Sequence, residues 1–259
     1  MKNVLRTVKA VVILWAVAVA LASAAEVWET KPFPEWSDKD IEKLMNDSPW
    51  AGKASLTHAA GGGERGPVPE WKVIVAVRSA LPIRQAFVRR SLGPGVAPTP
   101  EVEKILATSP TIYVIALGGF SRMQQMALGK AGQATVLKPK GKDPIPASAG
   151  SVMLLDKDGN PMPTPAPRGR QASAGDLQIL TVAQRGGGGF GGGGGGVGGG
   201  GGFGGANDGS TAMLIVEFPK TTAITAADGE VEVATVVDRY NVKKTFKLKD
   251  MMFQGSFAF

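Results

Sequence analysis

Few residues of this chain could carry chemistry. The 259-residue sequence contains one histidine, His58, and no cysteine. Zinc and copper sites usually draw on several histidines or cysteines, and thiol chemistry needs cysteine itself. A Ser-His-Asp triad would have to use His58, and the sequence has no G-x-S-x-G nucleophile elbow. We therefore expect no metal site, no catalytic triad and no bound cofactor.

Acidic residues offer two further possibilities. Residues 156–160 (Asp-Lys-Asp-Gly-Asn) begin like a calcium loop, but Pro161 and Pro167 stand where such a loop has glycine and glutamate. An Asp-Gly pair after an apolar strand predicts a simple turn, which explains these residues better. A glycosidase needs two carboxylates, and no spacing motif selects a pair among the candidates Glu70, Glu101, Glu103, Glu217, Glu230 and Glu232.

Tryptophans are the residues with the clearest potential for ligand contact. Four are concentrated in the first third of the chain: Trp28, Trp36, Trp50 and Trp71. Aromatic side chains give rigid contact area, so these four could line a carbohydrate or peptide groove. Packing in the core is the alternative role, and the sequence favours it.

Basic residues cluster near the C-terminus at Lys243, Lys244, Lys247 and Lys249. They could bind an anionic surface, but lysines also protect edge strands from mispairing, and we expect an edge strand here.

An Arg-Gly-Gly unit begins at Arg185, yet no other arginine borders the glycines that follow. We expect no nucleic-acid partner, because a modest positive charge spread along a chain reflects solubility rather than nucleic-acid binding.

The N-terminus has the three parts of a secretory signal. Cations at Lys2, Arg6 and Lys9 precede an apolar run and the small residues Ala22-Ser23-Ala24. The apolar run is shorter than the roughly 20 residues that span a bilayer. We therefore expect cleavage after residue 24, no transmembrane anchor, and export to the periplasm or the extracellular space. Cleavage would leave 26 basic and 22 acidic residues, a net charge of +4.

Hydrophobic patterning predicts an α+β fold, mainly antiparallel sheet with about nine or ten strands and three or four short helices. The segment 26–34 should be extended. Ser37 should cap a helix, Pro82 should open a second, and Thr99 should cap a third over residues 100–107. A helical turn is expected at residues 123–128. Strands are expected at residues 52–58, 71–77, 111–117, 135–138, 152–156, 177–184, 212–218, 230–237, 242–248 and 253–259.

Two segments should interrupt a single β-rich domain over residues 25–259. Residues 139–175 are rich in Pro, Ala and Gly, and residues 186–205 contain glycine at 17 of 20 positions. The glycine segment cannot bury enough surface to offset its ordering entropy, so we expect a disordered loop. The chain after it is too short to fold readily alone, so its strands should complete a sheet begun earlier.

Four short patches resemble a family of uncharacterised exported bacterial proteins. The opening reads Pro-Phe-Pro-Glu-Trp-Ser at residues 32–37 and Asn-Asp-Ser-Pro-Trp-Ala at 46–51. Residues 79–84 (Ser-Ala-Leu-Pro-Ile-Arg) resemble an internal motif, and residues 246–255 (Phe-Lys-Leu-Lys-Asp-Met-Met-Phe-Gln-Gly) the family's ending. The resemblance implies an exported protein and brings no known activity.

The sequence thus favours a non-catalytic domain over an enzyme. One histidine, no cysteine and no nucleophile motif predict an exported binding or structural domain of the cell envelope or the secreted proteins. Its partner would be an envelope or extracellular ligand that the sequence does not specify. The alternative is a carboxylate-based hydrolase acting on polysaccharide.

Overall fold

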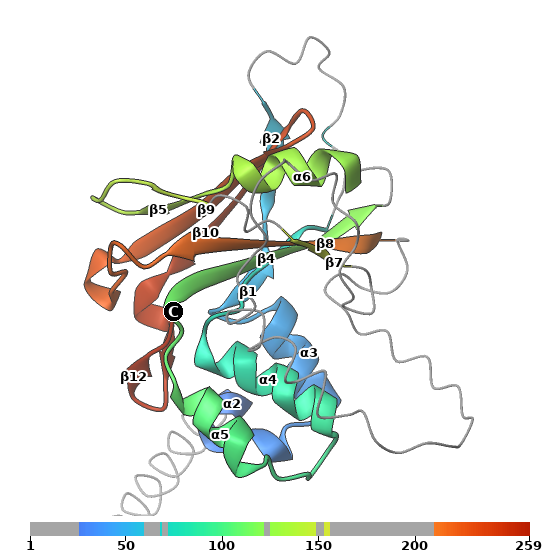
Figure 1. Ribbon diagram of the computed structural model, residues 1–259, viewed down its shortest axis with the longest axis vertical. Helices are drawn as coiled ribbons and strands as arrows, with labels where there is room; N and C mark the ends of the chain where they lie inside the picture. The colour runs from blue at the N-terminus through green and yellow to red at the C-terminus, as the bar shows by residue number, and fades with distance from the viewer. Residues whose placement is uncertain (1–25, 60–67, 69–71, 122–124, 149–152, 156–209) are drawn as a thin grey trace, which may run out of the picture.

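The structure is a computed structural model that describes residues 26–59, 68, 72–121, 125–148, 153–155 and 210–259. Four predictions lie outside these residues: the secretory signal, the calcium-like loop, the strand at 177–184 and the disordered glycine segment. The described part is mixed α+β with antiparallel strand pairing throughout, so the predicted fold class is confirmed (Figure 1).

Two five-stranded sheets form the body of the protein. Sheet A has the order β1-β3-β4-β8-β7, with β1 (Ala51–Lys53), β3 (Ile74–Val77), β4 (Ile112–Ser121), β8 (Ser210–Pro219) and β7 (Met153–Leu155). Sheet B has the order β2-β10-β9-β5-β6, with β2 (Ser55–His58), β10 (Tyr240–Lys247), β9 (Glu230–Val237), β5 (Val136–Pro139) and β6 (Ile145–Pro146).

The two sheets are connected at both edges. The strand predicted at residues 52–58 is in fact β1 and β2, which bend at Ala54 from sheet A into sheet B. At the other edge, Ser148 follows β6 and donates its N–H to the carbonyl of Glu217 in β8. The covalent link at Ala54 and this hydrogen bond therefore hold the two sheets together on opposite sides.

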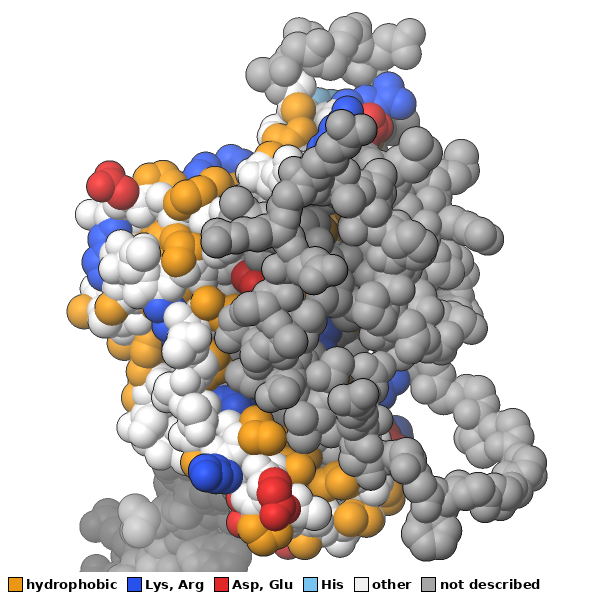
Figure 2. Space-filling model, viewed as in Figure 1, with side chains coloured by type: hydrophobic (Ala, Val, Ile, Leu, Met, Phe, Trp, Pro, Cys, Tyr) orange, Lys and Arg blue, Asp and Glu red, His pale blue; other side chains and the backbone are white. Residues whose placement is uncertain are grey.

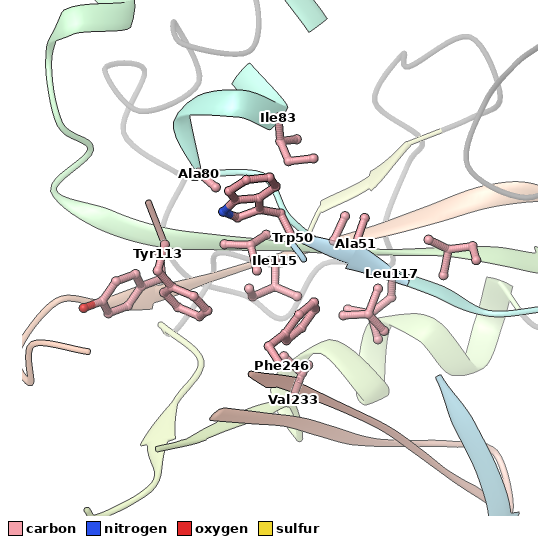
Figure 3. Packing of buried hydrophobic residues seen from close by; sticks show 14 of the residues in the cluster. Trp50, Ala51, Ala80, Ile83, Tyr113, Ile115, Leu117, Val233 and Phe246 are labelled. Carbon is pink, nitrogen blue, oxygen red and sulfur yellow. The ribbon is translucent and has the colours of Figure 1, made fainter. Parts of the chain in front are cut away.

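The hydrophobic core lies between the two sheets. Along β3, β4 and β8, alternate residues such as Val75, Ile115 and Val216 face inward, and sheet B contributes Val233 and Phe246. Figure 3 shows Ile115 and Leu117 pointing from sheet A toward Phe246 and Val233 of sheet B. Burial at this period of two is the pattern that the apolar strands of the sequence predict.

Helices cover both ends of this core (Figure 1). The N-terminal helices α2 (Val27–Thr30), α3 (Asp38–Asn46), α4 (Leu81–Leu92) and α5 (Pro100–Ala107) gather at one end, whereas α6 (Gln125–Gln133) packs on β8 and β9 at the other. The caps of two helices are confirmed. The Ser37 hydroxyl accepts from the N–H of Asp40, and that of Thr99 from the N–H of Val102.

Besides the strand at 52–58, the structure corrects further predictions. Residues 26–34 are not extended but contain α2 and the start of a 3-10 helix, Phe33–Glu35. The single strand at 253–259 is a hairpin of β11 (Met252–Phe253) and β12 (Ser256–Phe257). The strand β6 was not predicted. Finally, β10 is an interior strand between β2 and β9, so its lysines do not protect an edge.

Candidate functional site

Three of the four predicted contact residues lie in the core. Trp28, Trp36 and Trp50 are 2%, 1% and 0% exposed. The ring of Trp50 contacts Trp28 and Phe253 edge-on, with centroids 6.2 and 6.1 Å apart. Edge-to-face pairs of this kind add to the stability gained from burial.

The polar edges of two tryptophans are also occupied. Trp36 donates its indole N–H to the Lys31 carbonyl at 3.0 Å, and Trp50 donates to the carbonyl of Ala258. Both side chains therefore join chain segments together, which is the packing role that the sequence favours. Trp71 lies outside the described residues, and ligand contact by the four tryptophans stays a prediction.

The candidate carboxylates among the described residues are spread over several elements, and Glu70 lies outside those residues. Glu101 and Glu103 lie in the first turn of α5, and Glu217 lies in β8. Glu230 and Glu232 lie in β9 on the exposed face of sheet B, where Glu232 pairs with Lys138 at 3.5 Å. His58 ends β2 and stacks on Tyr240 with ring centroids 5.3 Å apart. Among the described residues, no group of three metal-binding side chains comes together.

Three lysines of the cluster lie on β10 and divide between the two faces of sheet B, whereas Lys249 lies in the 3-10 helix Leu248–Asp250 that follows. Lys243 and Lys247 point outward, whereas Lys244 is opposite Val233 on the inner face. The Lys244 ammonium lies against Gly52, which leaves room for it because glycine has no side chain. Burial lowers the pKa of Lys244, and the charge of Asp47 offsets part of this effect. On the face seen in Figure 2, charged side chains of both signs are scattered over the described surface.

Three buried arginines instead single out the junction of β3 and α4. Arg78, Arg84 and Arg89 are 8%, 6% and 2% exposed. Arginine is seldom buried without a partner, because moving a charge out of water is costly. The surroundings of each guanidinium therefore show what it does.

Two of these arginines connect α4 to other helices. Arg84 donates to the carbonyls of Ile105, Leu106 and Thr108 at the C-terminal end of α5. Carbonyls at a helix end lack the usual N–H partner four residues on; that of Ile105 also accepts the N–H of Thr108 at 3.2 Å. A cation there also offsets the helix dipole. Arg89 donates to Asp38, the first residue of α3, at 3.4 Å. Both contacts are structural.

Arg78 differs from the other two. Its N–H bonds to the Val114 carbonyl at 2.7 Å, which continues the β3–β4 pairing by one residue. Its side chain lies over the ring of Phe87 at 3.9 Å from the centroid, and Nη1 approaches the sulfur of Met213 at 3.3 Å. Its Nε has no hydrogen-bond partner, and no described carboxylate pairs with it.

The surroundings of Arg78 are otherwise apolar. By the alternation of β3, Arg78 falls on the face of sheet A that carries Ala76, Ala116 and Ile215. Ala116 and Ile215 form a small second cluster with Met213 and Val114, separate from the main core. Burial in this environment lowers the pKa of Arg78 to about 9. The guanidinium therefore stays charged at neutral pH.

The chemistry available to this group is binding rather than proton transfer. Arginine donates up to five hydrogen bonds in one plane and accepts none. The neighbouring Ser79 hydroxyl accepts the N–H of Val114 at 3.2 Å, which leaves its own O–H as a further donor beside the guanidinium. The arrangement can hold an oxyanion, such as a carboxylate or a phosphate, in the plane of the guanidinium.

Sequence reasoning missed Arg78 as a candidate. The available signal was its position, directly after an apolar strand and on the same parity as Ile74 and Ala76. A cation at such a position faces a buried surface. Composition gave no hint of it, because Arg78 is one of 29 basic residues.

Comparison with known proteins adds no relative from which a role could be carried over. No protein-family model, no curated protein and no solved structure matches this chain. The resemblance of its short motifs to exported bacterial proteins therefore stays a prediction. Within the described residues, no helix is long and apolar enough to cross a membrane.

Proposed function

We propose that this protein is an exported, non-catalytic domain that binds a ligand or a partner of the cell envelope. The observation that carries the proposal is the buried Arg78, which has no acidic partner among the described residues. An unpaired buried charge costs stability. Such groups persist where function uses them, since functional sites are often built at the expense of stability.

The chemistry of the site favours binding over catalysis. A guanidinium with a pKa of about 9 is protonated at neutral pH, so it is a poor general base. It can recognise and orient an anionic group with no chemical step.

The predicted secretory signal favours a partner in the envelope or the extracellular space. The signal predicts an N-terminus at Ala25, which mass spectrometry of protein from an exporting host would reveal, and recovery of intact Met1 in the membrane fraction would contradict it.

The alternative function, a polysaccharide hydrolase, needs two carboxylates roughly 5–10 Å apart across a sugar-binding cleft. The described candidates lie on α5, on β8 and on the exposed face of β9. Glu230 and Glu232 share one face of one strand, but their surroundings include Lys247 opposite Glu230 and Lys138 beside Glu232. This arrangement is typical of a solvated strand surface.

One experiment separates the two functions. The purified protein is incubated with isolated envelope fractions and with insoluble polysaccharide, and both sedimentation and the release of reducing sugar ends are measured. The proposal expects saturable co-sedimentation with an envelope fraction and no reducing ends above background. Enzyme-dependent release of reducing ends, lost in Glu230→Gln or Glu217→Gln, would establish the hydrolase instead.

A further inference from the structure

Arg78 also indicates what kind of ligand the protein takes. We propose that Arg78 is the recognition residue for an oxyanion group, a carboxylate or a phosphate, carried by the ligand of the binding function proposed above. The inference rests on that function and adds the chemistry of the ligand. Three features of the described structure support it: the orientation of the guanidinium, its apolar setting, and the contrast with two neighbouring arginines.

The donor edge of Arg78 meets no strong acceptor among the described residues. Phe87 lies beneath the guanidinium at 3.9 Å from the ring centroid, as in a stacked cation–π pair. Stacking fixes the plane of the group and occupies one face, so hydrogen bonds form at the edge that carries the N–H donors. Of these donors, Nη1 meets only the sulfur of Met213, a weak acceptor, and Nε meets no acceptor. A bidentate oxyanion satisfies this edge.

The apolar setting makes an anion the matching partner. Phe87, Met213 and the buried pair Ala116 and Ile215 provide no negative charge near Arg78. Charges attract more strongly where water is excluded, so an oxyanion pairs more tightly here than with an exposed cation. A neutral ligand would leave the charge of Arg78 uncompensated.

The neighbouring arginines provide an internal comparison. Arg84 meets three helix carbonyls and Arg89 meets the Asp38 carboxylate, so the described chain supplies acceptors to both. Arg78 is buried to a similar degree, and its guanidinium meets only the Met213 sulfur, a weak acceptor. The Nε of all three arginines lacks a partner, so the difference lies in the acceptors at the Nη atoms. The difference indicates that its acceptor comes from a ligand.

The test compares Arg78→Met with two controls that carry the same substitution. Arg84→Met removes a guanidinium that has internal acceptors, and Arg90→Met removes an exposed cation of α4. Without ligand, Arg78→Met should be at least as stable as the unaltered protein, because it removes an unpaired charge from an apolar site. Arg84→Met should be clearly less stable, and Arg90→Met should be unchanged.

Inorganic phosphate and acetate are the probes, each compared with chloride at equal ionic strength. At about a hundredfold excess over the dissociation constant, a bound anion should raise the melting temperature of the unaltered protein by roughly 5–10 °C. The Arg78→Met variant should lose this shift and bind at least tenfold more weakly, whereas Arg90→Met should keep it. A shift with only one of the two anions identifies which oxyanion the ligand carries.

A second measurement tests the inference in the unaltered protein, where Arg78 is still present. The Nε–H resonance of Arg78, assigned by its absence in Arg78→Lys, should move on addition of the anion that stabilises the protein. No thermal shift and no movement of this resonance with either anion would overturn the inference. Strong destabilisation in Arg78→Met, equal to that in Arg84→Met, would overturn it too. Envelope binding that persists in Arg78→Met would reject this inference while leaving the proposed binding function intact.

Discussion

Gly119 is a residue whose lack of a side chain determines local structure. It lies in β4 where the pairing with β8 shifts register, between Leu117 and Phe120. Its φ of +94° is in the region that favours glycine, and a Cβ there would lie 2.2 Å from the carbonyl oxygen of Lys72. The backbone before β3 therefore approaches β4 closely enough to exclude any side chain.

A substitution at Gly119 should accordingly be severe. Gly119→Ala adds backbone strain of about 1–3 kcal/mol and a clash with rigid backbone of similar size, so we expect a loss of about 3 kcal/mol or more. Gly141→Ala is the matched control, because Gly141 has a φ of +74° and open space around it. It should lose only the strain, about 1 kcal/mol. Urea unfolding measures the free energy of unfolding of both variants. An equal loss of stability in the two would contradict a clash between a side chain at position 119 and the Lys72 carbonyl.

The buried arginines show where sequence reasoning stops at this scale. The capping roles of Ser37 and Thr99 follow from local sequence, and the structure confirms both. The role of Arg84 depends on α5, whose carbonyls lie more than 20 residues away in the chain. Whether an arginine is paired thus depends on contacts that no local pattern encodes. The sequence could indicate that Arg78 faces a buried surface, but only the structure shows which acceptors it meets.

Secondary structure was predicted best where the sequence signal is local. The apolar strands β3, β4, β8 and β9 have clear patterns, and each appears within a few residues of its expected position. The errors fall on very short elements. The hairpin of β11 and β12 turns at Gln254 and Gly255, both with positive φ, and a tight turn of this kind is easily read as continuous strand.

One ion pair connects two loops that precede strands of sheet B. Lys142 in the turn after β5 donates to Asp228 at 2.8 Å, and Asp228 also accepts the N–H of Thr225 at 2.8 Å. The hydrogen bond from Lys142 is the main reason that the pKa of Asp228 is lowered below its usual 3.8, followed by the N–H of Thr225. The two contacts fix the entry into β9 against the β5–β6 turn.

This pair should make stability depend on pH in a defined direction. Because folding lowers the pKa of Asp228, its contribution is fully present above pH 3.8 and is lost as the pH falls through the lower folded value. Asp228→Asn should therefore cost about 1 kcal/mol at neutral pH, and the cost should shrink toward zero in strong acid.

Urea unfolding at neutral pH and below pH 3.8 gives the comparison for Asp228→Asn. Glu232→Gln is the control, since its partner Lys138 is 3.5 Å away and both side chains are substantially exposed. Exposed pairs contribute little, so this variant should change stability by less than about 0.5 kcal/mol. A cost for Asp228→Asn that stays constant down to the lowest pH would contradict the role of the charged carboxylate.

At the scale of the whole molecule, the order of the strands was beyond sequence reasoning. The sheet order combines strands that are far apart in the chain, such as β2 with β10 and β4 with β8. Alternation of apolar residues shows which face of a strand is buried, but it does not identify the neighbouring strand. The bend at Ala54, which carries one predicted strand into both sheets, is a consequence of this packing.

The chain after the glycine segment pairs extensively with the chain before it. β8 pairs with β4 from Pro219 opposite Ile112 to Ser210 opposite Ser121, and β9 pairs with β5 at four positions. These pairings favour the prediction that residues 25–259 form one domain. If so, the glycine segment is a loop, and replacing residues 186–205 by a four-residue turn should stabilise the fold by up to about 1.4 kcal/mol.

Cutting the chain inside the glycine segment tests the domain prediction directly. A protease with aromatic specificity should cleave at Phe190 or Phe203, and the products are then separated by size exclusion without denaturant. The two fragments should elute together, because separating them would break the β4–β8 and β5–β9 pairs and expose the core between the sheets. In urea, the same fragments should separate, which shows that the cut was complete. Elution as two compact, independently folded pieces without urea would show instead that residues 206–259 form a second domain.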